Sequence, residues 1–123
     1  MGKPGNTGLR RIVTATFFSF AGLKTAWRNE AAFRQEAALC GLLIPAGLWL
    51  GQNAVERVLL IASCVLVLIV ELLNTAVELI VDRVGTGHHR LSGQAKDVGS
   101  AAVFMSLVLL FVVWGLIAWS RFA

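Results

Sequence analysis

The sequence predicts an all-α membrane protein, in which an N-terminal amphipathic helix on the membrane surface is followed by three membrane-spanning helices. Hydrophobic residues make up 57% of the 123 residues, above the roughly 45–50% of a typical water-soluble domain. They gather in three long runs, and most of the four tryptophans fall near the ends of these runs, where an amphipathic ring suits the membrane interface. The chain is too short for several domains, so we expect one membrane domain over residues 1–123.

The composition also limits the function classes. The formal net charge of +4 is too diffuse to indicate nucleic-acid binding, and beside apolar spans it suits anionic lipid headgroups. Cys40 and Cys64 lie within apolar runs with no further thiol at ligand spacing, so inert buried thiols are favoured over a disulfide or a metal site. We expect no cleavable signal peptide, because charged residues interrupt the apolar stretches that precede the first span.

The first helix is expected at about residues 8–28. Its apolar side chains recur at helical spacing, and basic residues supply polar positions between them. The apolar positions include Val13, Phe17, Phe20, Leu23 and Trp27, and the basic ones are Arg10, Arg11, Lys24 and Arg28. This pattern is typical of a helix lying in the membrane surface, and packing of the helix against the rest of the protein is compatible with it.

The first span is expected at about residues 31–50. It is the weakest of the three, since it reaches membrane length only if the helix begins near Ala31. Pro45 predicts a kink at or before that position. Glu30 and Arg34 are four residues apart, so on spacing alone a structural ion pair is the favoured interpretation of both.

The second and third spans are expected at about residues 55–84 and 97–120. Gly51-Gln52-Asn53 is a turn signal before the second span, and Gly85 to Asp97 is expected to be a polar loop before the third. Lys and Arg concentrate before the first span and around this second loop. That asymmetry predicts that the N-terminus and the second loop face the cytoplasm.

Polar residues inside the second span form a stripe on one face of the helix. At ~100° per residue, Glu71, Asn74 and Glu78 lie within about 60° of one another, and Thr75 and Asp82 belong to the same stripe. Ionisable groups inside a membrane-length apolar segment are costly to keep. These residues are therefore functional candidates.

Three kinds of function fit this stripe. Carboxylates at the membrane edge are suitable ligands for Mg²⁺, Lys96 offers a cation for phosphate, and the deeper Glu71 offers a proton acceptor. The residues expected to converge on the cytoplasmic side are Glu30, Glu71, Asn74, Glu78, Lys96 and Asp97. The stripe also suits a cation or proton pathway, or a polar seam between subunits, and periodicity does not separate these from catalysis. The sequence contains no Gly-x-x-x-x-Gly-Lys-Ser/Thr loop.

Three segments of the chain resemble the motifs of the prokaryotic integral-membrane diacylglycerol kinase family. They are Asn29 to Glu36 (NEAAFRQE), Glu71 to Glu78 (ELLNTAVE) with the following Asp82-Arg83, and Lys96 to Val103 (KDVGSAAV). Their order and separations match, and the resemblance covers the chain from about Gly8 to Phe122.

The resemblance implies a homotrimeric bundle in the bacterial inner membrane, with active sites shared between neighbouring subunits. Such an enzyme transfers the γ-phosphate of ATP to the primary hydroxyl of 1,2-diacylglycerol and forms phosphatidic acid, as part of phospholipid metabolism. By position, Glu71 resembles the general base and Asn74 the residue that orients the centre, while Glu30 and Glu78 resemble the Mg²⁺ ligands.

The resemblance also implies nucleotide and lipid contacts. The positions that match nucleotide contacts are Arg11, Phe18, Glu30, Glu78, Gly87, His88, His89, Lys96 and Asp97. Those that match lipid contacts are Arg11, Ser19, Phe20, Lys24, Trp27, Phe33, Arg34, Trp49, Glu71 and Ser100. Two positions depart from the family pattern, since Phe18 stands where a tyrosine is common and Gly87 where we expect an acidic residue.

Two alternatives stay open at this point. An undecaprenol kinase of the same family would use the same catalytic motifs, because nothing in the apolar spans selects the lipid. A small cation transporter belongs to a different class, and it would move ions without consuming ATP.

Overall fold

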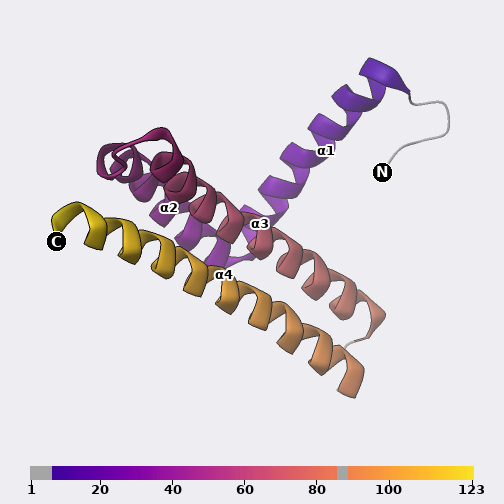
Figure 1. Cartoon of the computed structure of the whole chain (residues 1–123). Coiled ribbons are helices and arrows are strands. Elements are labelled where there is room, and N and C mark those ends of the chain that lie inside the picture. Colours follow the sequence, from indigo (N-terminus) through magenta and orange to yellow (C-terminus); the bar gives the residue numbers. More distant parts are fainter. Residues whose placement is uncertain (1–6, 86–88) are drawn as a thin grey trace.

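The computed structural model describes residues 7–85 and 89–123, and within them the chain forms α-helices and no strands. The helices are α1 (Gly8–Asn29), α2 (Ala31–Leu50), α3 (Ala54–Val84) and α4 (Arg90–Phe122). Helices α2, α3 and α4 lie side by side, whereas α1 projects away from them (Figure 1). The predicted all-α class is confirmed, and the long third helix is the element on which the others pack.

Capping interactions explain where α3 begins. The side chain of Asn53 accepts a hydrogen bond of 2.9 Å from the backbone N–H of Glu56. The Glu56 carboxylate in turn accepts one of 2.9 Å from the backbone N–H of Gln52. The arrangement resembles a capping box, except that the Glu56 carboxylate binds the N–H one residue before the N-cap Asn53, and two otherwise unpaired N–H groups are satisfied. The predicted turn at residues 51–53 is therefore confirmed.

Helix α4 begins earlier than the sequence predicts. Most of the expected polar loop, from Arg90 to Asp97, is helical, and Nδ1 of His89 accepts a 3.1 Å hydrogen bond from the N–H of Leu91 at the start of the helix. Polar composition alone suggested a loop, but a capped helix can continue beyond the apolar part of its sequence. The first two turns of α4 thus place Lys96 on a rigid element.

The buried core lies where α2, α3 and α4 meet. Leu60, Cys64 and Val67, on successive turns of α3, are almost completely buried. The indole N–H of Trp114 on α4 donates a 3.2 Å hydrogen bond to the carbonyl of Leu60, and Gly47 on α2 leaves room for both residues. The two cysteine thiols are buried and free, as the sequence predicts. Because Gly47 has no side chain, α2 packs closely against α3 and α4 at this position.

Two arginines connect the helices at the end that holds the α2–α3 turn. Arg57 on α3 donates through Nε to the carbonyl of Leu48 at 3.2 Å, and Arg121 on α4 donates to the carbonyl of Leu50 at 3.3 Å. The Arg121 guanidinium also lies 5.2 Å from the ring centroid of Trp49. Cationic groups at a helix C-terminus pair with its unsatisfied carbonyls, so these contacts terminate α2.

The outward surface of the bundle is apolar. Leu42 on α2 and Phe111 on α4, for example, are 74% and 73% exposed. Water-soluble proteins rarely expose a large continuous apolar surface. Of the helices in the described ranges, α3 and α4 are long and apolar enough to cross a membrane. These features indicate a membrane protein with two candidate spans. Helix α2 runs through Pro45 as one element.

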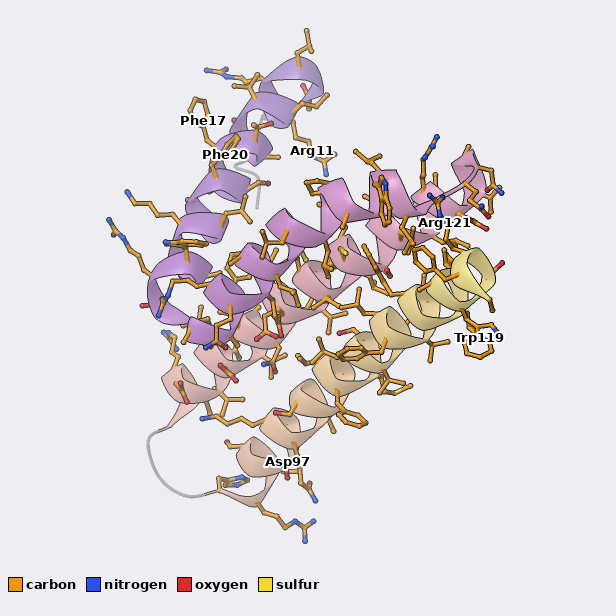
Figure 2. The ribbon with its side chains drawn as sticks, turned by 90° about the vertical axis from the view of Figure 1, so that its left-hand side faces the viewer. Arg11, Phe17, Phe20, Asp97, Trp119 and Arg121 are labelled. Carbon is orange, nitrogen blue, oxygen red and sulfur yellow. The ribbon has the colours of Figure 1, made fainter. Side chains whose placement is uncertain are left out.

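Helix α1 exposes apolar and basic side chains, and its hydroxyl groups form hydrogen bonds within the helix. Phe17 and Phe20 are 72% and 68% exposed and lie on the projecting part of the helix (Figure 2). Its hydroxyl side chains each donate to the carbonyl four residues earlier; they are Thr14, Thr16, Ser19 and Thr25. This local bonding lowers the cost of placing such a helix against lipid.

Candidate active site

The polar stripe of α3 turns inward, toward α2 and α4. Glu71, Asn74 and Thr75 are buried, with 3%, 8% and 4% of their surface exposed. Glu78 is half-buried and Asp82 is exposed, so the stripe runs from the interior of the bundle to its surface. The geometry confirms that the stripe occupies one helix face.

Glu71 is the most deeply placed carboxylate of the stripe. The hydroxyl of Thr75 donates to the backbone carbonyl of Glu71 at 3.0 Å, so it does not serve the side chain. Oε2 of Glu71 is buried and has no hydrogen-bond partner in the described part of the chain. The carboxyl of Glu36 on α2 lies near the Glu71 carboxyl. A carboxylate in so dry an environment is a typical proton acceptor.

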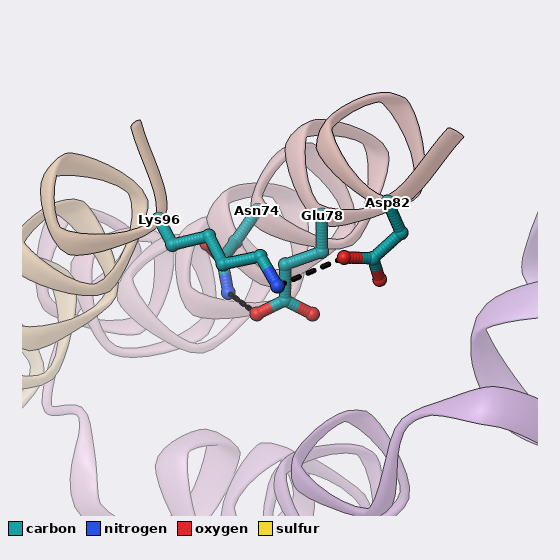
Figure 3. Close-up of polar contacts among 4 residues, drawn as sticks. All are labelled: Asn74, Glu78, Asp82 and Lys96. Carbon is teal, nitrogen blue, oxygen red and sulfur yellow. Dashed lines mark hydrogen bonds and ion pairs between the residues drawn. The ribbon is translucent and has the colours of Figure 1, made fainter. Parts of the chain in front are cut away.

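Asn74 lies between the deep and the shallow carboxylates. Its Nδ2 donates a 3.3 Å hydrogen bond to Oε1 of Glu78 (Figure 3). Its Oδ1 is buried without a hydrogen-bond partner in the described residues and faces Gly99 of α4, so closely that a Cβ at position 99 would overlap it. Gly99 therefore makes room for the amide that orients Glu78.

Glu30 enters the site from the break between α1 and α2. It has extended backbone angles, ends the first helix and begins the second. The predicted ion pair between Glu30 and Arg34 is wrong, because the Arg34 guanidinium instead donates to the carbonyls of Trp27 at 2.6 Å and Arg28 at 3.3 Å. The unpaired C-terminal carbonyls of α1 offer better acceptors than a side chain on the other face of the break.

The freed Glu30 carboxyl faces Glu78. A hydrogen-bonding contact with Glu78, then burial, then the negative charges of Glu78, Glu71 and Asp82 raise the pKa of Glu30 above its ordinary 4.5. Like charges at short range disfavour ionisation of both groups. The two carboxyls thus form a site where a cation would relieve repulsion.

This donor set suits Mg²⁺, although one chain supplies few ligands. Within residues 7–85 and 89–123 no group of three or more His, Cys, Asp or Glu side chains is arranged to hold a metal ion. Mg²⁺ is commonly bound by one or two carboxylates together with substrate phosphates and water. Glu30 and Glu78 fit that pattern, because their two carboxyls approach each other.

Lys96 reaches the same end of the bundle from α4. Its Nζ lies 2.8 Å from Oδ1 of Asp82, and the two side chains are 45% and 63% exposed (Figure 3). The lysine is therefore held beside Glu78 at the open end of the stripe, where an exposed pair contributes little stability but fixes a cation. Sequence spacing does not anticipate this partner for Lys96.

The other predicted site residues do not all lie near Glu78. Asp97 follows Lys96 and is exposed on the first turns of α4, whereas Arg11 is on the projecting part of α1, at the opposite end of the molecule in Figure 2. Phe18 is exposed on α1. Trp49 packs against Arg121 at the far end of the bundle.

The remaining predicted contacts divide between surface and interior. Phe33 is buried within the chain, while Phe20 and Trp27 are exposed. Ser19, Lys24 and Ser100 are also exposed. His89 caps α4 through its own Nδ1. Gly87 and His88 lie outside the described residues.

Sequence reasoning missed two residues that line the site. Glu36 was not assigned a role, yet it is three residues after the buried Phe33 and four before the buried Cys40. A carboxylate at that spacing belongs to the inward face of a helix, and this signal was available. The contact of Gly99 with Asn74 depends on how α3 and α4 pack, and no local pattern carries that information.

Fold and site together define a small helical membrane protein with a cluster of carboxylates, one buried and others half-buried, toward one end of its bundle. A model of one family, described as prokaryotic diacylglycerol kinase, matches residues 17–118. The chain belongs to this family. It is 49% identical over 116 residues to the diacylglycerol kinase of Escherichia coli K12, covering 94% of this chain and 95% of that one. It is 52% identical over 113 residues to that of Pseudomonas aeruginosa, and 50% over 109 to that of Haemophilus influenzae, each covering about nine tenths of both chains.

Proposed function

We propose that this protein transfers the γ-phosphate of ATP to the primary hydroxyl of 1,2-diacylglycerol and so forms phosphatidic acid. The observation that carries the proposal is the Glu71 carboxylate, which is 97% buried in a candidate membrane span and has an oxygen without a partner in the described chain. It lies beside a second carboxyl pair, Glu30 and Glu78, nearer the end of the helix. Relatives at about half identity over most of their length carry this activity in their names.

Each residue takes a role that its position supports. Glu71 accepts the proton of the lipid hydroxyl, because it is the carboxylate placed deepest in the bundle. Asn74 holds Glu78 in orientation through its 3.3 Å hydrogen bond. Lys96 presents a cation to the phosphates at the open end of the stripe.

Glu30 and Glu78 would hold Mg²⁺. When bound, the ion neutralises charge on the phosphates of ATP and so favours their approach to an acidic site. Phosphoryl transfer asks a protein chiefly to position donor and acceptor and to balance charge. A few carboxylates and one lysine on packed helices meet these needs without a nucleotide-binding fold.

The same proposal includes a homotrimer in the bacterial inner membrane. The nucleotide position Arg11 lies on the projecting part of α1, far from the nucleotide position Asp97 in Figure 2, so a neighbouring subunit would bring its own α1 over the site. Helix α2 would form a third span and α1 would lie on the cytoplasmic surface. The exposed phenylalanines of α1 and its internally bonded hydroxyls suit that position.

The test is transfer of label from γ-labelled ATP in mixed micelles, with diacylglycerol and undecaprenol offered in parallel. We expect labelled phosphatidic acid from the wild type, and loss of most turnover in Glu71→Gln with assembly intact. Glu56→Gln is the matched control, because Glu56 is a carboxylate on the same helix that caps its opposite end.

Each other outcome of this experiment identifies a rival. Label only in the polyprenol would keep the mechanism and change the substrate. Label in neither lipid would refute the kinase and favour transport, which ion flux into vesicles would then reveal. Near-normal activity of Glu71→Gln would remove Glu71 from the role of base.

A further inference from the structure

Glu36 is a buried-face carboxylate to which the proposed reaction gives no role. It follows Phe33 by one turn and precedes Cys40 by one turn, and both of these residues are buried, with 5% and 3% exposed. Helical spacing therefore places Glu36 on the side of α2 that packs against α3. Burial of an unpaired charge is costly, so a carboxylate in this position requires a partner or a proton.

Sγ of Cys40 donates a 3.4 Å hydrogen bond to the carbonyl of Cys64 on α3, so the side of α2 that carries Glu36 faces the side of α3 that carries Glu71. The two carboxyls approach each other across this interface. Oε2 of each residue is buried, and neither oxygen has a hydrogen-bond donor in the described part of the chain. Two ionised carboxylates can only accept hydrogen bonds, so their contact would leave two repelling, unsatisfied charges. A single proton between them supplies the missing donor and removes one charge.

Among the residues that the structure describes, the groups around Glu36 do not supply a countercharge. Glu71 is the acidic group that faces Glu36 from α3, and Cys40 lies beside Glu36 on its own helix. The nearest arginine in the sequence, Arg34, is engaged with the carbonyls of Trp27 and Arg28. Lys96 is paired with Asp82. A proton is therefore the partner that the two carboxyls lack.

We propose that Glu36 and Glu71 share one proton and that Glu36 is the positioning residue of the proposed base. The hydrogen bond through this proton fixes the orientation of the Glu71 carboxyl. The oxygen of Glu71 outside this bond accepts the proton of the lipid hydroxyl. This inference rests on the proposed kinase reaction for the role of Glu71, but the shared proton does not.

The reaction balances with this arrangement. The hydroxyl oxygen of the lipid forms a bond to the γ-phosphorus, and the bond from that phosphorus to the β–γ bridging oxygen breaks, with ADP as the leaving group. The hydroxyl proton passes to Glu71, while the shared proton stays between the two carboxyls. The pair then carries two protons and loses one to water before the next turnover.

The shared proton can be tested without turnover. Infrared spectra of the purified full-length protein in detergent at neutral pH should contain a carbonyl band of a protonated carboxylic acid. We expect the difference spectrum between wild type and Glu36→Gln to show loss of this band. The difference spectrum for Glu56→Gln should show no such loss. If the Glu36→Gln spectrum keeps the whole acid band, the proposal is wrong, whatever the activity of the protein.

Kinetics then test the positioning role. Glu36→Gln keeps a neutral donor, so we expect kcat within about tenfold of wild type, whereas Glu36→Leu removes the donor and should lower kcat by about 100-fold or more. The alkaline fall in the pH profile of kcat, caused by loss of the shared proton, should disappear in Glu36→Gln. Equal losses in both folded variants with an unchanged pH profile would show a merely structural role and overturn the proposal.

Each failure leaves a different trace. Absence of label transfer to either lipid with the acid band present would refute the proposed function and leave the proton pair standing. Label transfer to diacylglycerol without an acid band would refute the shared proton and leave the proposed function standing. Elution of each variant as the wild-type assembly from a sizing column establishes that the compared proteins are folded.

Discussion

A single methyl group added at Gly99 should disable the site through Asn74. Gly99 is on α4, and a Cβ built there would overlap Oδ1 of Asn74, whose backbone is on α3. The amide would have to rotate away or the two helices would have to separate. Rotation breaks the 3.3 Å hydrogen bond from Nδ2 of Asn74 to Glu78, so Gly99→Ala acts on a proposed metal ligand without touching it.

The size of the effect follows from these contacts. A hydrogen bond to a charged group contributes about 1.5–3 kcal/mol, and a strained side-chain rotamer costs about 0.5–1.5 kcal/mol. About 2 kcal/mol corresponds to roughly 30-fold in rate. We therefore expect Gly99→Ala to lower kcat/KM by about 10- to 100-fold.

Gly93→Ala is the matched control, since Gly93 is on the same helix and a Cβ there meets nothing within 4 Å. Both substitutions gain about 1 kcal/mol of helix propensity, so that gain cancels between them. We expect near wild-type activity for Gly93→Ala.

The assay is label transfer under saturating and subsaturating Mg²⁺-ATP, run as a double-mutant cycle with Asn74→Ala. If Gly99→Ala acts through Asn74, adding it to Asn74→Ala should change activity by less than about twofold, since no amide is left to displace. Full activity of Gly99→Ala would refute the close approach of the two residues. Additive losses in the cycle would refute the route through Asn74.

Three further predictions concern the surrounding charges. Glu78→Ala should raise the Mg²⁺ concentration needed for half-maximal activity by about tenfold or more, and an unchanged Mg²⁺ dependence would exclude its metal role. Because the pKa of Glu30 is raised, its contact with Glu78 favours the folded protein below pH 4.5 and this contribution is lost as pH rises through the folded-state pKa. Mg²⁺ should therefore raise the thermal midpoint more at mildly alkaline than at mildly acidic pH, and an equal rise at both would contradict this. Lys96→Met should lower turnover while changing the thermal midpoint little, since the ion pair of Lys96 with Asp82 is exposed. A large loss of stability would contradict the small contribution expected of this pair.

Local rules in the sequence predicted most of the fold. The helix bounds near residues 8–29, 31–50 and 54–84 follow from hydrophobic spacing and from the turn before Ala54. The start of α4 was missed because its first two turns are polar, and the cap by His89 depends on one side-chain rotamer rather than on composition. Two of the three expected spans meet the length and hydropathy of a membrane helix.

The site was predictable only along α3. Glu71, Asn74 and Glu78 share a face because their spacing dictates it. Interactions between helices were not predictable, because the register of α2 against α3 and of α3 against α4 is set by packing. The contacts of Glu36 with Glu71 and of Gly99 with Asn74 both depend on that register. Arg34 is a further example. Its four-residue spacing from Glu30 predicted an ion pair, but in the structure its guanidinium donates to backbone carbonyls.

The contacts between the three packed helices are distributed unequally along the bundle. At one end Arg57 and Arg121 anchor α3 and α4 to carbonyls of α2, and Trp114 ties α4 to α3. At the site end the polar contacts are carboxyl pairs and one exposed ion pair. Small separations of the helices should therefore occur preferentially at the site end, pivoting about the arginine contacts. A water-soluble nucleotide and a membrane-dissolved lipid could then exchange through the same opening without dismantling the core that holds the helices in register.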